Sequence, residues 1–332
     1  SASQNQVAYY VKGISSEPTG ELYGGNIGKI KGYGVGVYLD GGTLDANSSE
    51  LDYTTNAASG FNGNGIIGLL MKNDADISAY NKNIKVGDSA ELPDKSKFYA
   101  IGIYADAQGS STTPKTIATS ITTGKDGVGL FAENGSNIIY TGTMNIGDGT
   151  TAGTGIYIGN GGTGATKPST VEIGDGTTTG GANISLNGKN GVGAIVTTKS
   201  NAVFNKYSTI TFTGAGVGIY GQKGAIITDK GGTLITNGNS VERTRITEGS
   251  SRIENDLTGI NAVDTGNIVS HVINGEAIVD SGITIEAKSN SKNIIGLMAD
   301  GNKEPYPSHV TWAGARDYEA INNGIIDLSN AT

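Results

Sequence analysis

Acidic side chains are the residues of this sequence whose types and spacing could carry chemistry. Asp74 and Asp76 alternate in "KNDADIS", and Asp148 and Asp175 occupy two "IGDGT" segments. Many glycan-cleaving enzymes use two neighbouring carboxylates, one as the acid and one as the base or nucleophile. Asp-Gly pairs, however, are ordinary turn formers, and alternating aspartates beside a strand are usually solvated. The sequence therefore favours turns over a catalytic pair, and we expect no enzymatic activity.

Metal-binding patterns are weak in this sequence. The stretches "GDGT" and "GNGGTG" (159–164) are superficially similar to calcium-binding nonapeptide repeats, but the required glycine–aspartate spacing does not occur in series. His271 and His309 are the two histidines, and the chain has no cysteine. Zinc–cysteine sites and cysteine nucleophiles are thereby excluded. We expect neither a metal nor a cofactor.

The charge balance narrows the classes of partner. The formal net charge is −8, and charged residues make up 16% of the chain. A nucleic-acid-binding protein would show a basic stripe, and none is visible. No apolar run reaches transmembrane length. We therefore expect no nucleic-acid partner and no direct membrane insertion of this segment.

A short motif recurs along the chain: a glycine lies between aliphatic residues, and an aromatic residue often follows, as in "GVGVY", "IGIYA", "GVGLF", "GTGIY" and "GVGIY". The mean interval is about 32 residues, which is typical of solenoids and arrays. The aligned glycines are Gly36, Gly68, Gly102, Gly129, Gly155, Gly193, Gly218, Gly259 and Gly296, of which the Gly259 member is the weakest.

Short β-branched runs closed by glycine, asparagine or aspartate lie between the motifs, and helical periodicity is almost absent. Several short strands per period of this length predict an all-β parallel β-helix, in which each strand pairs with its equivalent in the next coil. A WD-like propeller or a β-sandwich is the alternative. Propeller repeats carry Trp-Asp signatures, and the chain has one tryptophan, so the propeller is disfavoured.

The motif carries its own structural expectations. In "GVGLF", alternation places Val128 and Leu130 on one face, and we expect both to point into the core. We expect Gly129 to adopt a positive φ at a tight turn. The aromatic residue that follows lies outside or fills a corner, and the sequence does not decide between these positions.

The chain is interpreted as a single β-helical segment, 1–332, with four insertions. Segments that break the repeat lie near 45–64, 86–100, 239–257 and 300–320. Because loops on a rigid scaffold often carry function, the last two are the candidate binding surfaces.

Candidate binding residues come from these two segments. The first holds three of the four arginines, interleaved with glutamates, and predicts either a short helix or loop with ion pairs or a ligand-facing insertion. The second holds the only tryptophan, and aromatic and arginine side chains are the usual anchors of binding hot spots; it could also be a packed loop that covers a neighbouring coil. The candidates are Arg243, Arg245, Arg252, Tyr306, His309, Trp312 and Arg316.

The stretches "GVGIYGQKGAIITDKGGTLITNG" (216–238), "GVGLFAENGSNIIYTGTMNIGDG" (127–149) and "AINNGIIDLSN" (320–330) resemble repeats in passenger domains of type V autotransporters, in particular the large fusobacterial outer-membrane adhesins of the RadD type. The resemblance implies a right-handed parallel β-helix that is displayed on the bacterial surface and anchored in the outer membrane by a C-terminal barrel. It also implies coaggregation with other bacteria or attachment to host cells.

We therefore expect a monomeric cell-surface adhesin segment that binds a protein or glycan receptor on a host or bacterial cell without covalent chemistry. A spacer with no ligand of its own is the first alternative. A glycan-processing β-helix enzyme is the second, and it would need carboxylates from several coils to converge.

Overall fold

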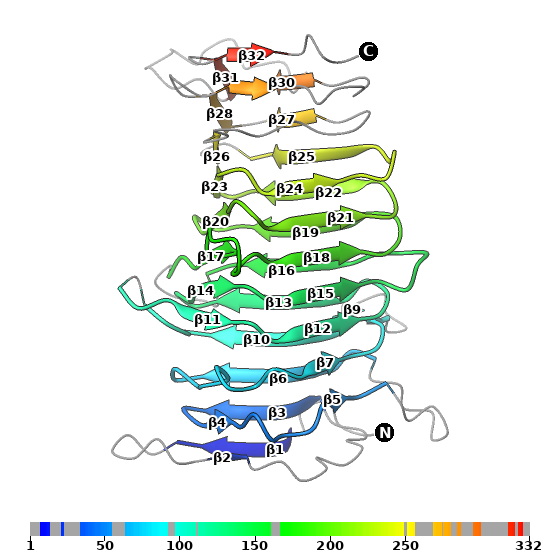
Figure 1. Ribbon diagram of the computed structural model, residues 1–332, viewed down its shortest axis with the longest axis vertical. Coiled ribbons are helices and arrows are strands. Elements are labelled where there is room, and N and C mark those ends of the chain that lie inside the picture. The colour runs from blue at the N-terminus through cyan, green and yellow to red at the C-terminus, as the bar shows by residue number, and fades with distance from the viewer. Residues whose placement is uncertain are drawn as a thin grey trace, which may run out of the picture.

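The computed structural model describes residues 7–13, 21–22, 34–54, 64–91, 97–110, 112–160, 167–248, 251–255, 268–273, 275–279, 284–286, 295–299, 318–322 and 325–327. Every regular element in these residues is a β-strand. The strands stack along one axis, with the N-terminal coils at one end and the C-terminal coils at the other (Figure 1). The candidates Tyr306, His309, Trp312 and Arg316 lie outside the described residues.

The long sheet has eleven parallel strands, one for each successive coil. It contains β1 (Val7–Lys12), β3 (Val35–Asp40), β6 (Ile67–Lys72), β10 (Ile101–Asp106), β13 (Val128–Glu133), β16 (Thr154–Ile158), β19 (Gly191–Val196), β22 (Gly216–Gly221), β25 (Val241–Ile246), β27 (Ile268–Val272) and β30 (Ile295–Ala299).

Two further parallel sheets run beside it. The eight-stranded sheet contains β11 (Lys115–Ile117), β14 (Asn137–Tyr140), β17 (Thr170–Ile173), β20 (Asn201–Phe204), β23 (Ile226–Asp229), β26 (Arg252–Asn255), β28 (Gly275–Val279) and β31 (Tyr318–Asn322). The seven-stranded sheet contains β5 (Leu51–Asp52), β7 (Asn83–Lys85), β12 (Ser120–Thr123), β15 (Thr143–Ile146), β18 (Asn183–Leu186), β21 (Thr209–Phe212) and β24 (Thr233–Ile235).

Three two-stranded sheets complete the described structure. They pair β2 (Glu21–Leu22) with β4 (Thr43–Leu44), β29 (Thr284–Glu286) with β32 (Ile325–Asp327), and β8 (Ala90–Glu91) with β9 (Lys97–Phe98). The last pair is antiparallel and lies within the predicted insertion at 86–100.

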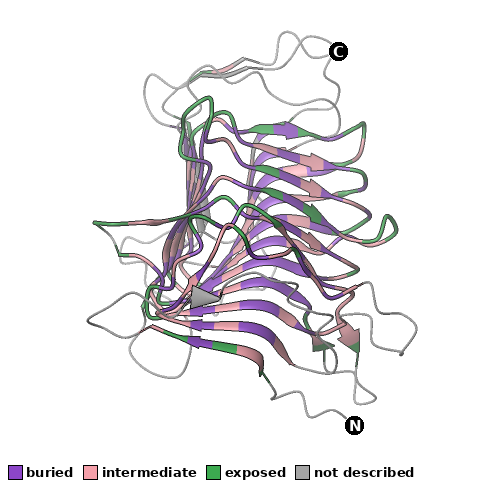
Figure 2. Ribbon diagram, turned by 60° about the horizontal axis from the view of Figure 1, so that its bottom comes forward, coloured by how far each residue is buried: buried purple, intermediate pink, exposed green. Residues whose placement is uncertain are grey.

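The chain visits the long, eight-stranded and seven-stranded sheets in turn, and each strand pairs with the strand one coil away. This arrangement confirms the predicted all-β parallel β-helix. Inward residues of the three sheets form a continuous core, which Figure 2 shows as buried positions repeated along the stacked strands.

The motif glycines pack against the seven-stranded sheet. A Cβ added at Gly102 would lie 2.3 Å from Cγ2 of Ile121, and one added at Gly155 would lie 2.9 Å from Cγ2 of Ile184. The motif glycines of the described strands have no positive φ. The predicted tight turn is therefore wrong: glycine is needed because the facing sheet leaves no space for a side chain.

The same glycine interrupts the alternation of side chains. Leu130 is fully buried in the core, whereas Val128, which exposes 6% of its surface, is buried outside the core cluster. Because Gly129 and Leu130 both face inward, Val128 is left on the outer side of the long sheet. The prediction that both aliphatic residues point inward is wrong for the first of them.

Candidate functional site

The segment 239–257, predicted as an insertion, is part of the regular stack. It supplies β25 to the long sheet and β26 to the eight-stranded sheet. In the register of β22 and β25, Ile219 pairs with Thr244 and Val217 with Glu242, so Arg243 takes the position of Gly218. β25 and β27 both lack the motif glycine, whose position Arg243 and Val269 take, so the interval of 41 residues between Gly218 and Gly259 does not measure one coil. Gly259 itself lies outside the described residues.

Arg243 is therefore a core residue, and the prediction that it faces a ligand is wrong. Its side chain reaches back to the preceding coil, where Nε lies 2.5 Å from Asp229 Oδ2 and a terminal nitrogen lies 2.8 Å from Oδ1. The same nitrogen donates to the Gly232 carbonyl at 2.7 Å, and the guanidinium lies 5.2 Å from the Phe204 ring centroid. This bidentate pair satisfies two charges that the core would otherwise leave unpaired.

The other two candidate arginines lie at the surface. Arg252, on β26, forms an ion pair with Glu254 at 3.3 Å and is largely exposed. Arg245, on β25, lies 3.6 Å from Glu242. The structure thus separates the three arginines into one core residue and two surface residues on different sheets.

The candidate aspartates serve as turn residues. Asp148 Oδ1 accepts bonds from the Thr150 hydroxyl at 2.6 Å and from the Thr150 and Thr151 amides at 2.8 Å. These bonds lower the pKa of Asp148 to about 2, the Thr150 hydroxyl contributing most. Asp175 accepts equivalent bonds from Thr177, whose hydroxyl contributes most to the lowering of its pKa.

The remaining acidic pair does not form a joint site. Asp74 Oδ1 lies 3.3 Å from Lys115 Nζ, while Asp76 accepts a bond from the Ser78 amide. Across the described part of the chain, no group of three or more acidic or histidine side chains is placed to hold a metal ion. Within the same residues no helix is long and apolar enough to cross a membrane.

The outer face of the long sheet carries two columns of largely apolar side chains. The aliphatic column contains the first motif residue of each coil: Val35, Ile67, Ile101, Val128, Thr154, Val192, Val217, Glu242 and Ile268. The aromatic column contains the residue three positions later: Tyr38, Leu70, Tyr104, Phe131, Tyr157, Ile195, Tyr220, Arg245 and His271. The motif aromatic thus lies outside the core.

Three rings of the aromatic column stack on one another. The Phe131 centroid lies 4.9 Å from that of Tyr104 and 4.5 Å from that of Tyr157, with interplanar angles of 8° and 12°. Both faces of Phe131 are thus covered by neighbouring rings. The Tyr104 hydroxyl donates to Glu133, and burial raises the pKa of Glu133. Because stacked rings present their edges to solvent, this column is poorly suited to stacking on sugar faces.

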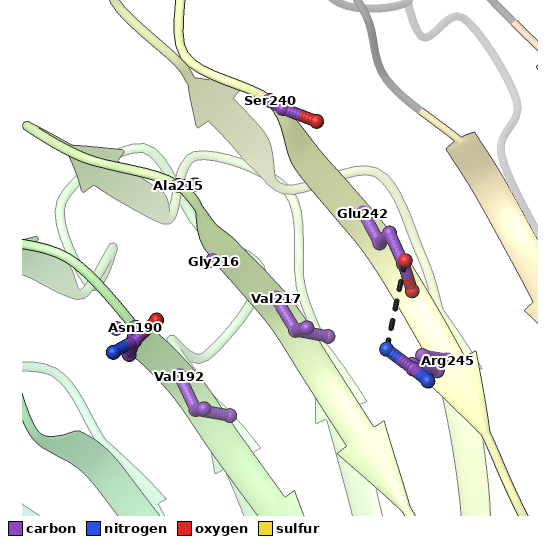
Figure 3. A pocket seen from close by; sticks show the side chains of 9 residues that line it. Asn190, Val192, Ala215, Gly216, Val217, Ser240, Glu242 and Arg245 are labelled. Atoms are coloured by element: carbon purple, nitrogen blue, oxygen red, sulfur yellow. Dashed lines mark ion pairs between the residues drawn. The ribbon is translucent and has the colours of Figure 1, made fainter.

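A groove lies on the same outer face where β19, β22 and β25 begin. Its volume is about 380 Å³, and it is lined by Asn190, Gly191, Val192, Ala215, Gly216, Val217, Ser240, Glu242 and Arg245. Figure 3 shows Val192, Val217 and Glu242 in one row, one on each strand. The groove is hollow because Gly191, Ala215 and Gly216 at the strand starts have small side chains or none. Val192 and Val217 line it with apolar side chains.

Charged groups close one end of the groove. Glu242 Oε2 lies 3.1 Å from Nδ1 of His271, and Glu242 Oε1 lies 3.6 Å from Arg245 (Figure 3). The His271 side chain is buried, with 6% of its surface exposed. Among the described residues, no acceptor or donor lies within hydrogen-bonding distance of the buried atoms Arg245 Nε and His271 Nε2. Both atoms are buried, so they lie beneath the surface of the groove.

Sequence reasoning singled out Arg245 but missed Val192, Val217 and Glu242. The signal that could have found them is the repeat itself, since all three occupy one motif position. Using that signal requires β25 to be recognised as a repeat that lacks its glycine.

No protein-family model, curated protein or solved structure matches this chain.

Proposed function

We propose that this chain is the β-helical rod of a bacterial cell-surface adhesin, which attaches non-covalently to a receptor on another cell through the outer face of its long sheet. The observation that carries the proposal is the pair of apolar columns along that face. Most residues of the two columns are half-exposed, and contiguous apolar surface on a soluble protein often marks an interaction site.

The rest of the molecule supports the proposal. The stack of eleven strands supplies a rigid rod, and the repeat presents similar surfaces at each coil. Many weak contacts from clustered copies give strong attachment through avidity. The likeness of the repeats to adhesin passengers agrees with this role and with display at the outer membrane.

Binding of the purified, fluorescently labelled chain to a panel of bacteria and host cells tests the proposal. The first variant combines Val192→Lys with Val217→Lys, which places two cations on the outer face at half-exposed positions. The matched control combines Ser185→Lys with Thr211→Lys. These residues pair with each other on the seven-stranded sheet, belong to the same coils and are also half-exposed. A third variant, Trp312→Ala, tests the other segment that the sequence singled out.

Saturable binding that is lost with the Val192 and Val217 substitutions and kept in the control supports the proposal. Binding kept in that variant and lost with Trp312→Ala would move the site away from the long sheet and overturn its assignment. An intact fold, checked by circular dichroism, with no binding to any cell would favour the spacer and overturn the adhesin.

A further inference from the structure

Positive charge is concentrated in residues 176–241, although the whole chain has a formal net charge of −8. Asp229 is the single acidic residue of this segment, and its carboxylate is buried and bound by Arg243. The segment has five lysines, all exposed, and none of them forms an ion pair within the described part of the chain. They are Lys189, Lys199, Lys206, Lys223 and Lys230.

The fold brings four of these lysines to the two ends of one strand pair. β20 and β23 are neighbours in the eight-stranded sheet; Lys199 and Lys206 flank β20, and Lys223 and Lys230 flank β23. The Lys199 amide donates to the Lys223 carbonyl at 3.0 Å, and the Lys230 amide donates to the Phe204 carbonyl at 2.9 Å. Each end therefore has two lysines from adjacent coils, whose strands lie about 4.8 Å apart. The two ends are at most about 25 Å apart, because the two lysines of each coil are seven positions apart in the sequence.

Uncharged side chains form the surface between the two ends. The outward residues of β20 and β23 are half-exposed, and they are Asn201, Val203, Ile226 and Thr228. We call this surface, together with Lys199, Lys206, Lys223 and Lys230, the lysine face. Three acidic side chains border it, and each already accepts a hydrogen bond: Glu172 from Asn205, Asp175 from Thr177, and Glu254 from Thr228.

The backbone at Lys199 departs from what its residue type favours. Lys199 lies two residues before its strand at a φ of 62°, whereas Gly135 and Gly224 occupy this position in the coils of β14 and β23, at 80° and 79°. A left-handed backbone favours glycine, because a side chain is strained there. Strained positions of this kind cluster at ligand-binding sites, so Lys199 is a candidate for contact with a ligand.

We infer that the lysine face binds an acidic glycan, whose carboxylates reach the lysines at both ends and whose uncharged sugars lie over the surface between them. Charge complementarity carries the inference, because the four ammonium groups have no ion-pair partner among the described residues. The Asn201 amide and the Thr228 hydroxyl can form hydrogen bonds with sugar hydroxyl groups. Tyr207, which follows Lys206 and is 53% exposed, adds an aromatic ring beside one lysine pair. The lysine face is a second surface, so the inference does not depend on the assignment of the long sheet.

A nucleic acid fits the lysine face less well. Double-stranded DNA carries one negative charge for about each 1.7 Å of its axis, and the acidic remainder of the chain repels a polyanion of that density. Single strands bind to successive aromatic side chains on which their bases stack. Among the described residues of the lysine face and the turns beside it, only Tyr207 is both aromatic and exposed. A glycan with widely spaced carboxylates matches cations that lie at the two ends of an uncharged surface.

A hyaluronan decasaccharide tests the inference on the purified chain, because its carboxylate-bearing sugars alternate with uncharged ones. Its methyl ester is the matched neutral probe, and a single-stranded DNA oligonucleotide represents the other class of polyanion. Binding is measured by fluorescence polarisation of the labelled probes. We expect hyaluronan to bind about ten-fold more tightly than its ester and more tightly than the DNA. Its affinity should fall as the salt concentration rises from about 50 to about 200 mM.

Two sets of substitutions locate the binding. The face variant combines Lys199→Gln, Lys206→Gln, Lys223→Gln and Lys230→Gln, and it should bind hyaluronan about ten-fold more weakly than the parent. The control variant makes the same change in net charge at four other exposed lysines: Lys12→Gln, Lys82→Gln, Lys125→Gln and Lys189→Gln. The control should bind hyaluronan within about two-fold of the parent.

One further variant tests Lys199 in a chain that is expected to fold at least as well as the parent. Lys199→Gly gives this turn the residue that the equivalent turns carry, so it should raise the midpoint of urea unfolding. It should nevertheless weaken hyaluronan binding by about two- to five-fold, because one cation is lost.

Absence of hyaluronan binding, equal binding of its ester, tighter binding of the DNA, or equal losses in the face and control variants would overturn the inference. These outcomes are separate from the adhesin proposal. If cell attachment depends on Val192 and Val217 but hyaluronan does not bind, the glycan ligand is wrong and the adhesin stands. If hyaluronan binds as expected but no cell is bound, the lysine face stands and the adhesin proposal is overturned.

Discussion

Arg243 occupies the column that most other coils of the long sheet fill with glycine, and its guanidinium binds the fully buried carboxylate of Asp229 through two nitrogens. The pair links β25 to the end of β23 in the preceding coil. In most other coils the motif glycine has no side chain, and residues of the seven-stranded sheet pack against it. In the coil of β25 the Arg243 side chain occupies this space.

Breaking this pair from one side should destabilise the chain strongly. Arg243→Met leaves Asp229 buried and unpaired, and we expect the free energy of unfolding to fall by about 3–5 kcal/mol. Urea unfolding followed by circular dichroism measures the change. The double variant Arg243→Met with Asp229→Leu removes both charges and should recover most of the loss. A double variant as unstable as the single one would contradict this account.

Adding one methyl group at a motif glycine should also destabilise the fold. In Gly102→Ala the new Cβ meets Ile121 Cγ2 at 2.3 Å and the Gly129 carbonyl oxygen at 2.8 Å. We expect a loss of about 1–3 kcal/mol in the free energy of unfolding, as for other overpacked cores. Gly159→Ala is the control, because its Cβ would meet only the edge of the Tyr157 ring, at 3.1 Å, and Thr197 at 3.8 Å. Equal losses in the two variants would show that close packing is not the reason for the glycine.

The stacked rings should contribute to stability rather than to recognition of sugars. Phe131→Leu removes two ring pairs, each worth about 0.5–1.5 kcal/mol. We expect a lower free energy of unfolding and a weaker near-ultraviolet circular dichroism signal. Ile195→Leu, in the same column, is the control and should change neither. An unchanged near-ultraviolet signal in Phe131→Leu would argue against a rigid stack.

The turn at Asp148 should make stability depend on pH in the acid range. The pKa of Asp148 falls from 3.8 to about 2 on folding because the carboxylate accepts bonds from Thr150 and Thr151. A lowered carboxyl pKa stabilises the fold above the unfolded pKa, and this contribution disappears as the pH falls from about 4 to about 2. Asp148→Ala should therefore be less stable than the parent at pH 6, and the difference should shrink at pH 2.

The carboxyl carbon resonance of Asp148 provides a direct check, because it should titrate near pH 2. Asp175→Ala, at the equivalent turn, should behave in the same direction, since Thr177 lowers the pKa of Asp175 in the same way. A titration midpoint near 4 for Asp148 would contradict the account.

The repeat, the short β-branched runs and the near absence of helical periodicity were sufficient to predict an all-β parallel β-helix. The same local signals identified Asp148 and Asp175 as turn residues. These features depend on a few neighbouring residues, so they can be read directly from the sequence.

The sequence alone did not reveal the role of Arg243 or the position of the groove. β25 lacks the motif glycine, so its residues looked like an insertion, although they pair in register with β22. Local alternation likewise placed Val128 inside, because the interruption at Gly129 depends on contact with Met144 and Ile146 in the facing sheet. Pairing between coils joins residues about 25–40 positions apart, and only the tertiary stack decides which of them share a column.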